Sequence, residues 1–259
     1  MVHSGHGERR MGASKIEFRL RVPVMVVVIS LGFWAPWIEA WGRLRAIPGR
    51  ISLLEWLALE LSRLGLLSFT MATPAVIGLA SLLAAVAVVL RVWGTAYLGP
   101  GIVNHAEMKA GAVLADGPYR YVRNPLYLGS WFMVAAMAFL MPVTGALFVM
   151  VLVTVFLLRL ILGEEAFLAA QLGQPYQEYL HAVPRIFPRL RSNLPRTGRA
   201  PRWGHAVLAE LNPIGVFITL AVVSWSFNNW LMVRSILISF GISLVVRALM
   251  PRTGMPDSI

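Results

Sequence analysis

Apolar residues follow one another in long blocks along this chain, and charged residues are confined to the stretches between the blocks. A helix needs roughly 20 mostly apolar residues to cross a bilayer, and several blocks approach that length. We therefore predict six transmembrane helices, over 22–41, 73–90, 126–141, 144–161, 206–227 and 230–250. Only Pro142 and its neighbours separate the 126–141 and 144–161 blocks, which predicts a tight helical hairpin with an uncharged tip.

The segment 51–69 is apolar but interrupted by charged residues. Glu55, Glu60 and Arg63 fall within one half of a helical wheel, so the segment has a polar and an apolar face. A helix of this kind suits the boundary between lipid and water. We therefore expect it to lie in the membrane interface.

The distribution of Lys and Arg predicts the orientation of the spans. It places the N-terminus, the stretches 99–124 and 163–202 and the C-terminus on the cytoplasmic side. Six spans with both termini inside satisfy this distribution, except that Arg43, Arg45 and Arg50 then lie outside. If 51–69 crosses the membrane instead, these arginines move inside and the N-terminus moves outside, so both topologies stay open for this part of the chain.

Composition excludes a water-soluble globule, because 58% of the residues are hydrophobic, 14% are charged and the mean hydropathy is +0.69. The absence of cysteine excludes disulfides, thiolate metal sites and a cysteine nucleophile. The formal net charge of +11 could attract nucleic acid. Arginine clusters between apolar spans are, however, typical of loops that face anionic lipid headgroups. We therefore expect membrane lipids as partners and no nucleic acid.

Two polar stretches rich in Tyr, Arg, Glu and Pro flank the predicted hairpin. The first motif reads GPYRYVRNPLYLG over 117–129, and the second motif reads EEAFLAAQLGQPYQEYLHAVPR over 164–185. The hairpin should bring both motifs to the same membrane face. The sequence contains no GxGxxG, P-loop, HExxH or GxSxG signature, so it offers no sign of the common soluble nucleotide-binding and hydrolase sites.

This pair of motifs resembles the isoprenylcysteine carboxyl methyltransferase and phospholipid methyltransferase family of integral membrane enzymes. The resemblance covers 91–188 and departs from the family pattern at Asn124, where the family usually has histidine. Asn124 either replaces that histidine at the site or only favours extended backbone before Pro125. The resemblance implies S-adenosylmethionine as methyl donor, bound between the hairpin and a cytosolic C-terminal catalytic segment. The donor-binding positions that it implies are Asn104, Gly111, Ala112, Val113, Leu114, Tyr119, Asn124, Pro125, Tyr127 and Glu164.

The residue types at these positions suit such a donor. The aromatic faces of Tyr119 and Tyr127 can hold a cation or a base, and Glu164 can bind a hydroxyl or an ammonium group. An ionised carboxylate at the edge of the bilayer needs a partner or a ligand, which favours Glu164 as a site residue. We expect its neighbour Glu165 to be solvated or to pair with Arg123.

The methyl acceptor stays open between a carboxylate, an amine and a thiol. A carboxylate is already anionic and needs a cation, for which Arg159 is the candidate, whereas an amine or a thiol must lose a proton. We expect Arg159 and Glu164 to be catalytic. Arg159 lies five residues before Glu164, whereas the family's substrate-contacting arginine lies four before, which turns Arg159 to another helix face. Prenylcysteine specificity is therefore not supported.

The sequence thus predicts an all-α, multi-pass transmembrane protein of about six spans. We expect an N-terminal span plus interfacial helix over 1–70, a methyltransferase-like membrane core over 71–190, and an Arg-rich loop with a C-terminal helix pair over 191–259. The expected function is S-adenosylmethionine-dependent methyl transfer to a lipophilic acceptor, with the active site facing the cytoplasm. Two alternatives stay open: an NADPH-dependent membrane sterol or enone reductase, and a non-catalytic transporter or channel.

Overall fold

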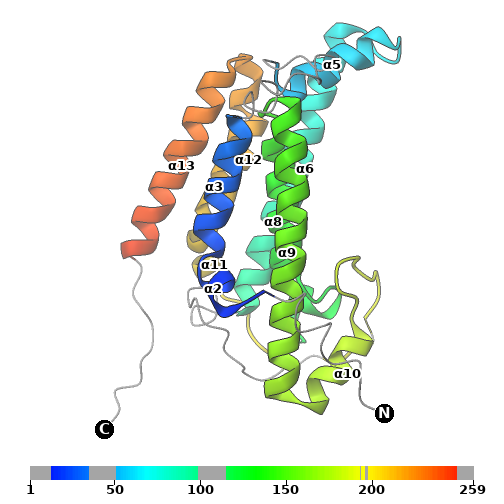
Figure 1. Ribbon diagram of the computed structural model, residues 1–259, viewed down its shortest axis with the longest axis vertical. Helices are drawn as coiled ribbons and strands as arrows, with labels where there is room; N and C mark the ends of the chain where they lie inside the picture. Colours follow the sequence, from blue (N-terminus) through cyan, green and yellow to red (C-terminus); the bar gives the residue numbers. More distant parts are fainter. Residues whose placement is uncertain (1–12, 35–50, 99–114, 193, 196–197, 250–259) are drawn as a thin grey trace.

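The computed structural model describes residues 13–34, 51–98, 115–192, 194–195 and 198–249, which form a helical bundle (Figure 1). The predicted all-α fold class is confirmed for this part of the chain. Its α-helices are α2 (Lys15–Arg19), α3 (Arg21–Phe33), α5 (Leu53–Arg63), α6 (Phe69–Leu98), α8 (Pro125–Ala138), α9 (Val143–Leu172), α10 (Gln174–Ala182), α11 (Trp203–Ala209), α12 (Leu211–Ala221) and α13 (Asn229–Leu249). The short 3-10 helices are η1 (Gly117–Arg120) and η2 (Val223–Ser226).

Three of these helices are long and apolar enough to cross a membrane: α6, α9 and the Trp230–Leu249 part of α13. A fourth span results if α11 and the segment Leu211–Ser226 count as one, although they meet at a bend of 69°. The helices α3 and α8 are apolar but shorter than a full span. The membrane character is therefore confirmed, and helix length supports three or four of the six predicted spans.

The helices α8 and α9 form the predicted hairpin, with Pro142 at the turn. However, α9 does not end near 161 as expected but continues to Leu172, and Gly173 with a φ of 64° ends it. The residues after 161 are good helix formers, and no left-handed glycine or proline interrupts them before Gly173. Glu164 and Glu165 therefore lie on a helix that extends beyond the apolar part of the hairpin.

The helix α5 lies at the end of the bundle where the hairpin turns (Figure 1). The Leu53 amide donates to the Met141 carbonyl oxygen over 2.8 Å, and the Leu54 amide donates to the Phe139 carbonyl oxygen over 2.9 Å. The next helix, α6, begins at this same end, so the chain between them does not cross the bundle. The helix α5 has 11 residues, fewer than a span needs, and the interfacial position predicted for 51–69 stays a prediction.

Small residues let α8 pack closely against α6. Ala84 and Ala87 of α6 are fully buried. A Cβ atom on Gly129 of α8 would lie 3.2 Å from the Ala87 carbonyl oxygen and 2.6 Å from Cγ of Arg91, so a larger residue would push the helices apart. Close approach through small residues is a common way for helices to associate in membranes. Gly129 ends the first motif, and it thereby holds the start of α8 against the last turns of α6.

Candidate active site

The two motifs fold onto one another at the end of the bundle that carries α10, opposite the hairpin turn (Figure 1). The Arg123 amide of the first motif donates to the Pro184 carbonyl oxygen of the second over 2.9 Å. The buried Tyr179 hydroxyl of the second motif donates to the Tyr119 carbonyl oxygen of the first over 2.8 Å. The prediction that the hairpin brings both motifs to the same face is confirmed.

Glu165 is the buried centre of a charged cluster. Its carboxylate pairs with Arg123 at 3.1 Å and with Arg185 at 2.8 Å, and Nδ2 of Asn124 donates to it over 3.0 Å. Glu165 is only 5% exposed. Of the two alternatives expected for it, a solvated side chain or a pair with Arg123, the structure shows the pair. Because two of these residues come from each motif, the cluster ties the motifs together.

Asn124 has a structural role in this cluster. Its Nδ2 also donates to the Arg185 carbonyl oxygen over 3.2 Å. It is the N-cap of α8 and directly precedes Pro125, but its side chain makes no capping hydrogen bond. The amide group therefore does more than set the backbone before proline. The contacts of Asn124 and Pro125 with a methyl donor stay predictions.

Glu164 lies on a different face of α9 from Glu165, because successive helical residues turn by about 100°. Its carboxylate interacts with the Tyr127 hydroxyl and lies within electrostatic range of Arg21. The Tyr119 hydroxyl lies within electrostatic range of the same carboxylate. Two predicted donor-binding tyrosines of the first motif and the predicted glutamate of the second are thus brought together.

The Tyr119 side chain is buried, at 8% exposure, and its hydroxyl has no hydrogen-bond partner in the described part of the chain. Burial, and after it the charge of Glu164, raises the pKa of Tyr119 well above its ordinary value, so the hydroxyl keeps its proton. Leaving a buried polar group unpaired costs on the order of 1 to 3 kcal/mol. This hydroxyl therefore fits the polar group of a ligand, as a donor-binding role requires.

Arg159 pairs with the N-terminal segment. Its Nη2 lies 2.9 Å from Oε1 and 3.1 Å from Oε2 of Glu17. Glu17 also closes a capping box with Ser14. The hydrogen bond from the Ser14 backbone, and after it the Arg159 guanidinium, hold the pKa of Glu17 below its ordinary value. Glu17 is therefore ionised at neutral pH. A contact between Arg159 and a methyl acceptor stays a prediction.

Glu17 and Arg21 were not singled out from the sequence. The S-x-x-E pattern of Ser14 and Glu17 is a recognisable signal for the start of a helix. The sequence alone could not predict on which side of the bundle that helix packs, because the position depends on tertiary contacts. Phe18 is 5% exposed and joins the same hydrophobic core as Leu157 of α9, which fixes the N-terminal segment beside this helix.

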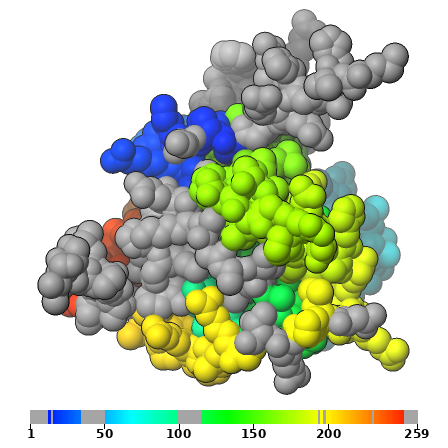
Figure 2. Space-filling view, turned by 90° about the horizontal axis from the view of Figure 1, so that it is seen from below, coloured from blue at the N-terminus to red at the C-terminus, as the bar shows by residue number. Residues whose placement is uncertain are grey.

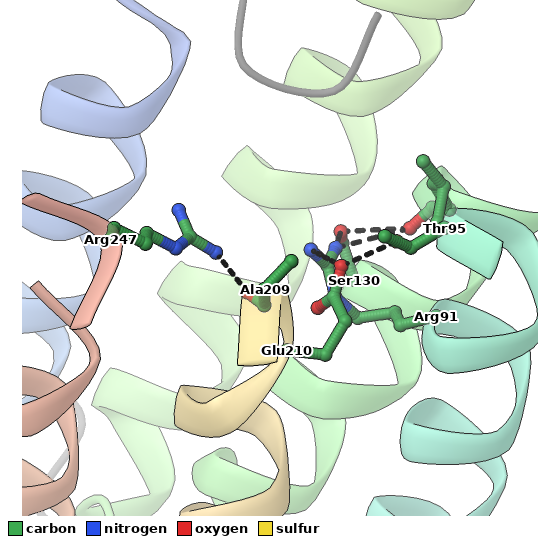
Figure 3. A network of polar contacts seen from close by, with 7 residues as sticks. Arg91, Thr95, Ser130, Ala209, Glu210 and Arg247 are labelled. Carbon is green, nitrogen blue, oxygen red and sulfur yellow. Dashed lines mark hydrogen bonds and ion pairs between the residues drawn. The ribbon is translucent and has the colours of Figure 1, made fainter. Parts of the chain in front are cut away.

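A second charged network lies where α6 and α8 meet the bend between α11 and α12 (Figure 3). Arg91 donates to the two Glu210 carboxylate oxygens over 2.6 and 3.1 Å and to the Ser130 hydroxyl over 2.6 Å. The Thr95 hydroxyl donates to Glu210 over 2.7 Å, and Arg247 of α13 donates to the carbonyl oxygen just before Glu210 over 2.7 Å. Glu210 is fully buried. Glu210 was not singled out from the sequence.

The other predicted donor-binding positions lie outside the residues that the structure describes. They are Asn104, Gly111, Ala112, Val113 and Leu114.

Seen from the end of the bundle that carries α10, helices and loops of the two motifs lie at the surface beside the N-terminal segment (Figure 2). Among the described residues, no group of three or more His, Asp or Glu side chains could hold a metal ion.

Comparison with known proteins agrees with this site. A model of the phospholipid methyltransferase family matches residues 73–175. That segment contains most of α6 and all of η1 and the α8–α9 hairpin, including Glu164. The resemblance inferred from the two motifs is therefore confirmed over this part of the chain.

Part of the sequence is also similar to that of one particular protein. The chain is 41% identical over 70 residues to a methanethiol S-methyltransferase of Crocosphaera subtropica (strain ATCC 51142 / BH68). The aligned stretch spans 27% of this chain and 27% of the relative. No solved structure matches the chain.

Proposed function

We propose that this protein transfers a methyl group from S-adenosylmethionine to a lipophilic acceptor that reaches the site laterally from the bilayer. One observation carries the proposal. The Tyr127 hydroxyl of the first motif interacts with Glu164 of the second, and the buried Tyr119 hydroxyl lies within electrostatic range of Glu164 and lacks a hydrogen-bond partner among the described residues. The match of 73–175 to a methyltransferase family supports the same reaction.

S-adenosylmethionine would supply an electrophilic methyl group attached to a sulfonium. Tyr119 and Tyr127 would offer aromatic faces to the cation or the adenine, and Glu164 would accept a hydrogen bond from a hydroxyl or an ammonium group. Asn124 and Pro125 would complete the wall at the start of α8. Asn104 and the stretch 111–114 are proposed as further contacts because of the family resemblance alone.

The site gives less information about the methyl acceptor than about the methyl donor. The relative from Crocosphaera subtropica is described as acting on methanethiol, which favours a thiol over a carboxylate or an amine. A thiol must lose its proton before or during attack, and Glu164 is a carboxylate at the site that could receive it. Arg159 suits a carboxylate acceptor less well, because Glu17 already engages its guanidinium.

Methyl transfer explains the observations better than the two alternatives. A sterol or enone reductase would need a site for NADPH, whereas the family match points to methyl transfer. A transporter would be expected to line a path with ionisable groups. Instead, Arg91 and Glu210 form a closed pair that also engages Ser130 and Thr95.

We further propose six spans with both termini and the active site on the cytoplasmic side, formed by α3, α6, α8, α9, the α11–α12 pair and α13. The division into 1–70, 71–190 and 191–259 remains part of this proposal. Cysteines placed at Leu64 and Asn228 should be labelled by an impermeant maleimide from one side, and a cysteine at Gln177 from the other. The chain has no cysteine of its own, so labelling of all three from one side would contradict this topology.

The activity is tested with purified protein, a methyl-labelled S-adenosylmethionine and dodecanethiol in nanodiscs. We expect label in dodecyl methyl thioether, at a rate that depends on protein concentration. Label that stays in the donor with thiol, amine and carboxylate acceptors of the same chain length would contradict the proposal.

A further inference from the structure

The N-terminal segment crosses α9 between Arg159 and Gly163. The Ala13 amide donates to the Arg159 carbonyl oxygen over 2.9 Å. A Cβ atom on Gly163 would lie 2.9 Å from both the nitrogen and the carbonyl oxygen of Ala13, so only glycine permits this close approach. Phe18 anchors the segment in the core, at 5% exposure. The segment therefore lies directly beside the helix turn that carries Glu164.

Charges on the N-terminal segment complement those on α9 at this crossing. Glu17 pairs with Arg159, and Arg21 lies within electrostatic range of Glu164. The Arg21 guanidinium also lies 4.5 Å from the centre of the Phe18 ring, which holds it close to the crossing. Two opposite-charge interactions thus bind one element to the other. Each of the two acidic side chains, Glu17 and Glu164, therefore has a cationic neighbour.

The contact between Glu17 and Arg159 has the geometry of a bound carboxylate. One guanidinium nitrogen lies within 3.1 Å of both Glu17 oxygens. A guanidinium prefers such contacts with carboxylates over most other groups. Arg159 is also the cation on α9 that an acceptor carboxylate would need near Glu164. Glu17 therefore already binds the Arg159 guanidinium that the carboxylate of such an acceptor would need.

We propose that Glu17 is a specificity-determining residue that occupies Arg159 and thereby selects against acceptors with a carboxylate, in favour of neutral acceptors such as thiols. The inference rests on the proposed methyltransferase function and narrows its acceptor class. A carboxylate would have to displace Glu17 or lie beside its charge, and two like charges in contact repel each other.

Glu17→Gln tests this directly. The substitution removes the charge but keeps an oxygen that can close the capping box with Ser14, so the helix start should persist. The probe is dodecanoate with a fluorophore at its methyl end, titrated into the full-length protein in nanodiscs. We expect the variant to bind dodecanoate about tenfold or more tightly than the wild type. The double variant Glu17→Gln/Arg159→Gln should return to the weak binding of the wild type.

Glu60→Gln is the matched control. Glu60 is a partly exposed acid that pairs with Arg63 at 3.5 Å on α5, at the other end of the bundle. This variant should bind dodecanoate as the wild type does. A dodecanethiol probe with the same fluorophore should bind the wild type and Glu17→Gln within about twofold of each other, because a neutral thiol does not compete for Arg159.

Equal dodecanoate affinity in wild type and folded Glu17→Gln would overturn the inference. If that variant does not fold, Arg159→Gln gives the second test. It should leave the weak dodecanoate binding unchanged, and a tenfold loss would show that Arg159 already receives the carboxylate. Dodecanoate selectivity at Glu17 without methyl transfer to any acceptor would support this inference and contradict the proposed function. Methyl transfer to dodecanethiol without that selectivity would support the proposed function and contradict this inference.

Discussion

Glu164→Gln is expected to raise the dissociation constant of S-adenosylhomocysteine roughly tenfold or more, because a carboxylate in a charge-assisted hydrogen bond contributes on the order of 1.5 to 3 kcal/mol. Glutamine has nearly the same shape and can still interact with the Tyr127 hydroxyl, so the loss reports the missing charge. Isothermal titration calorimetry of the detergent-solubilised variant measures this effect. A thermal unfolding curve close to that of the wild type must accompany it.

Glu165→Gln is the matched control, one residue away on the same helix. The change leaves Arg123 and Arg185 without their shared carboxylate, and breaking the buried Arg123–Glu165 pair costs about 3 kcal/mol. We therefore expect a lower unfolding temperature, by roughly 6 to 10 °C, and a smaller change in donor affinity than for the Glu164 variant. The opposite pattern, with donor binding lost only in folded Glu165→Gln, would contradict the assignment and shift every position of this motif by one.

Glu210→Gln is expected to be the most destabilising substitution considered for this chain. Glu210 is fully buried, and both of its oxygens accept hydrogen bonds from Arg91 (Figure 3). Removing one partner of a buried ion pair leaves an uncompensated charge and typically costs about 3 to 5 kcal/mol. For a chain of this size the unfolding temperature should fall by about 10 °C. Tryptophan fluorescence during heating in detergent measures it.

The double variant Arg91→Met/Glu210→Leu separates charge from packing. Replacing both members of a buried pair by apolar residues of similar volume is often neutral or stabilising. The double variant should therefore recover most of the unfolding temperature that Glu210→Gln loses. An unfolding temperature of Glu210→Gln equal to that of the wild type would contradict the account of this network.

The hydrophobic pattern was sufficient to predict the apolar helices that support the site. Long apolar blocks determine α6, the α8–α9 hairpin and α13, because a membrane leaves few other solutions for such sequences. The hairpin then brings the two motifs to one end, which is why Tyr119, Tyr127 and Glu164 could be selected together. The extension of α9 to Leu172 was missed, since polar residues beyond 161 no longer show the apolar pattern.

The sequence could not predict which charged residues meet. Arg91 and Glu210 are separated by 119 positions, and their pairing depends on how the C-terminal helices pack on α6. The same holds for Arg159 and Glu17, which are 142 positions apart. Glu165 was expected either to be solvated or to pair with Arg123, and the structure shows the pair and a buried side chain. Its burial follows from the second motif folding back over α9, which no local pattern encodes.

Calorimetry of the detergent-solubilised full-length protein with S-adenosylhomocysteine and, separately, with NADPH tests most directly the central claim that the two motifs form a methyl donor site. The account predicts binding of S-adenosylhomocysteine with a dissociation constant in the micromolar range and no binding of NADPH. Tight NADPH binding without any binding of S-adenosylhomocysteine or S-adenosylmethionine would contradict the account and favour a membrane reductase.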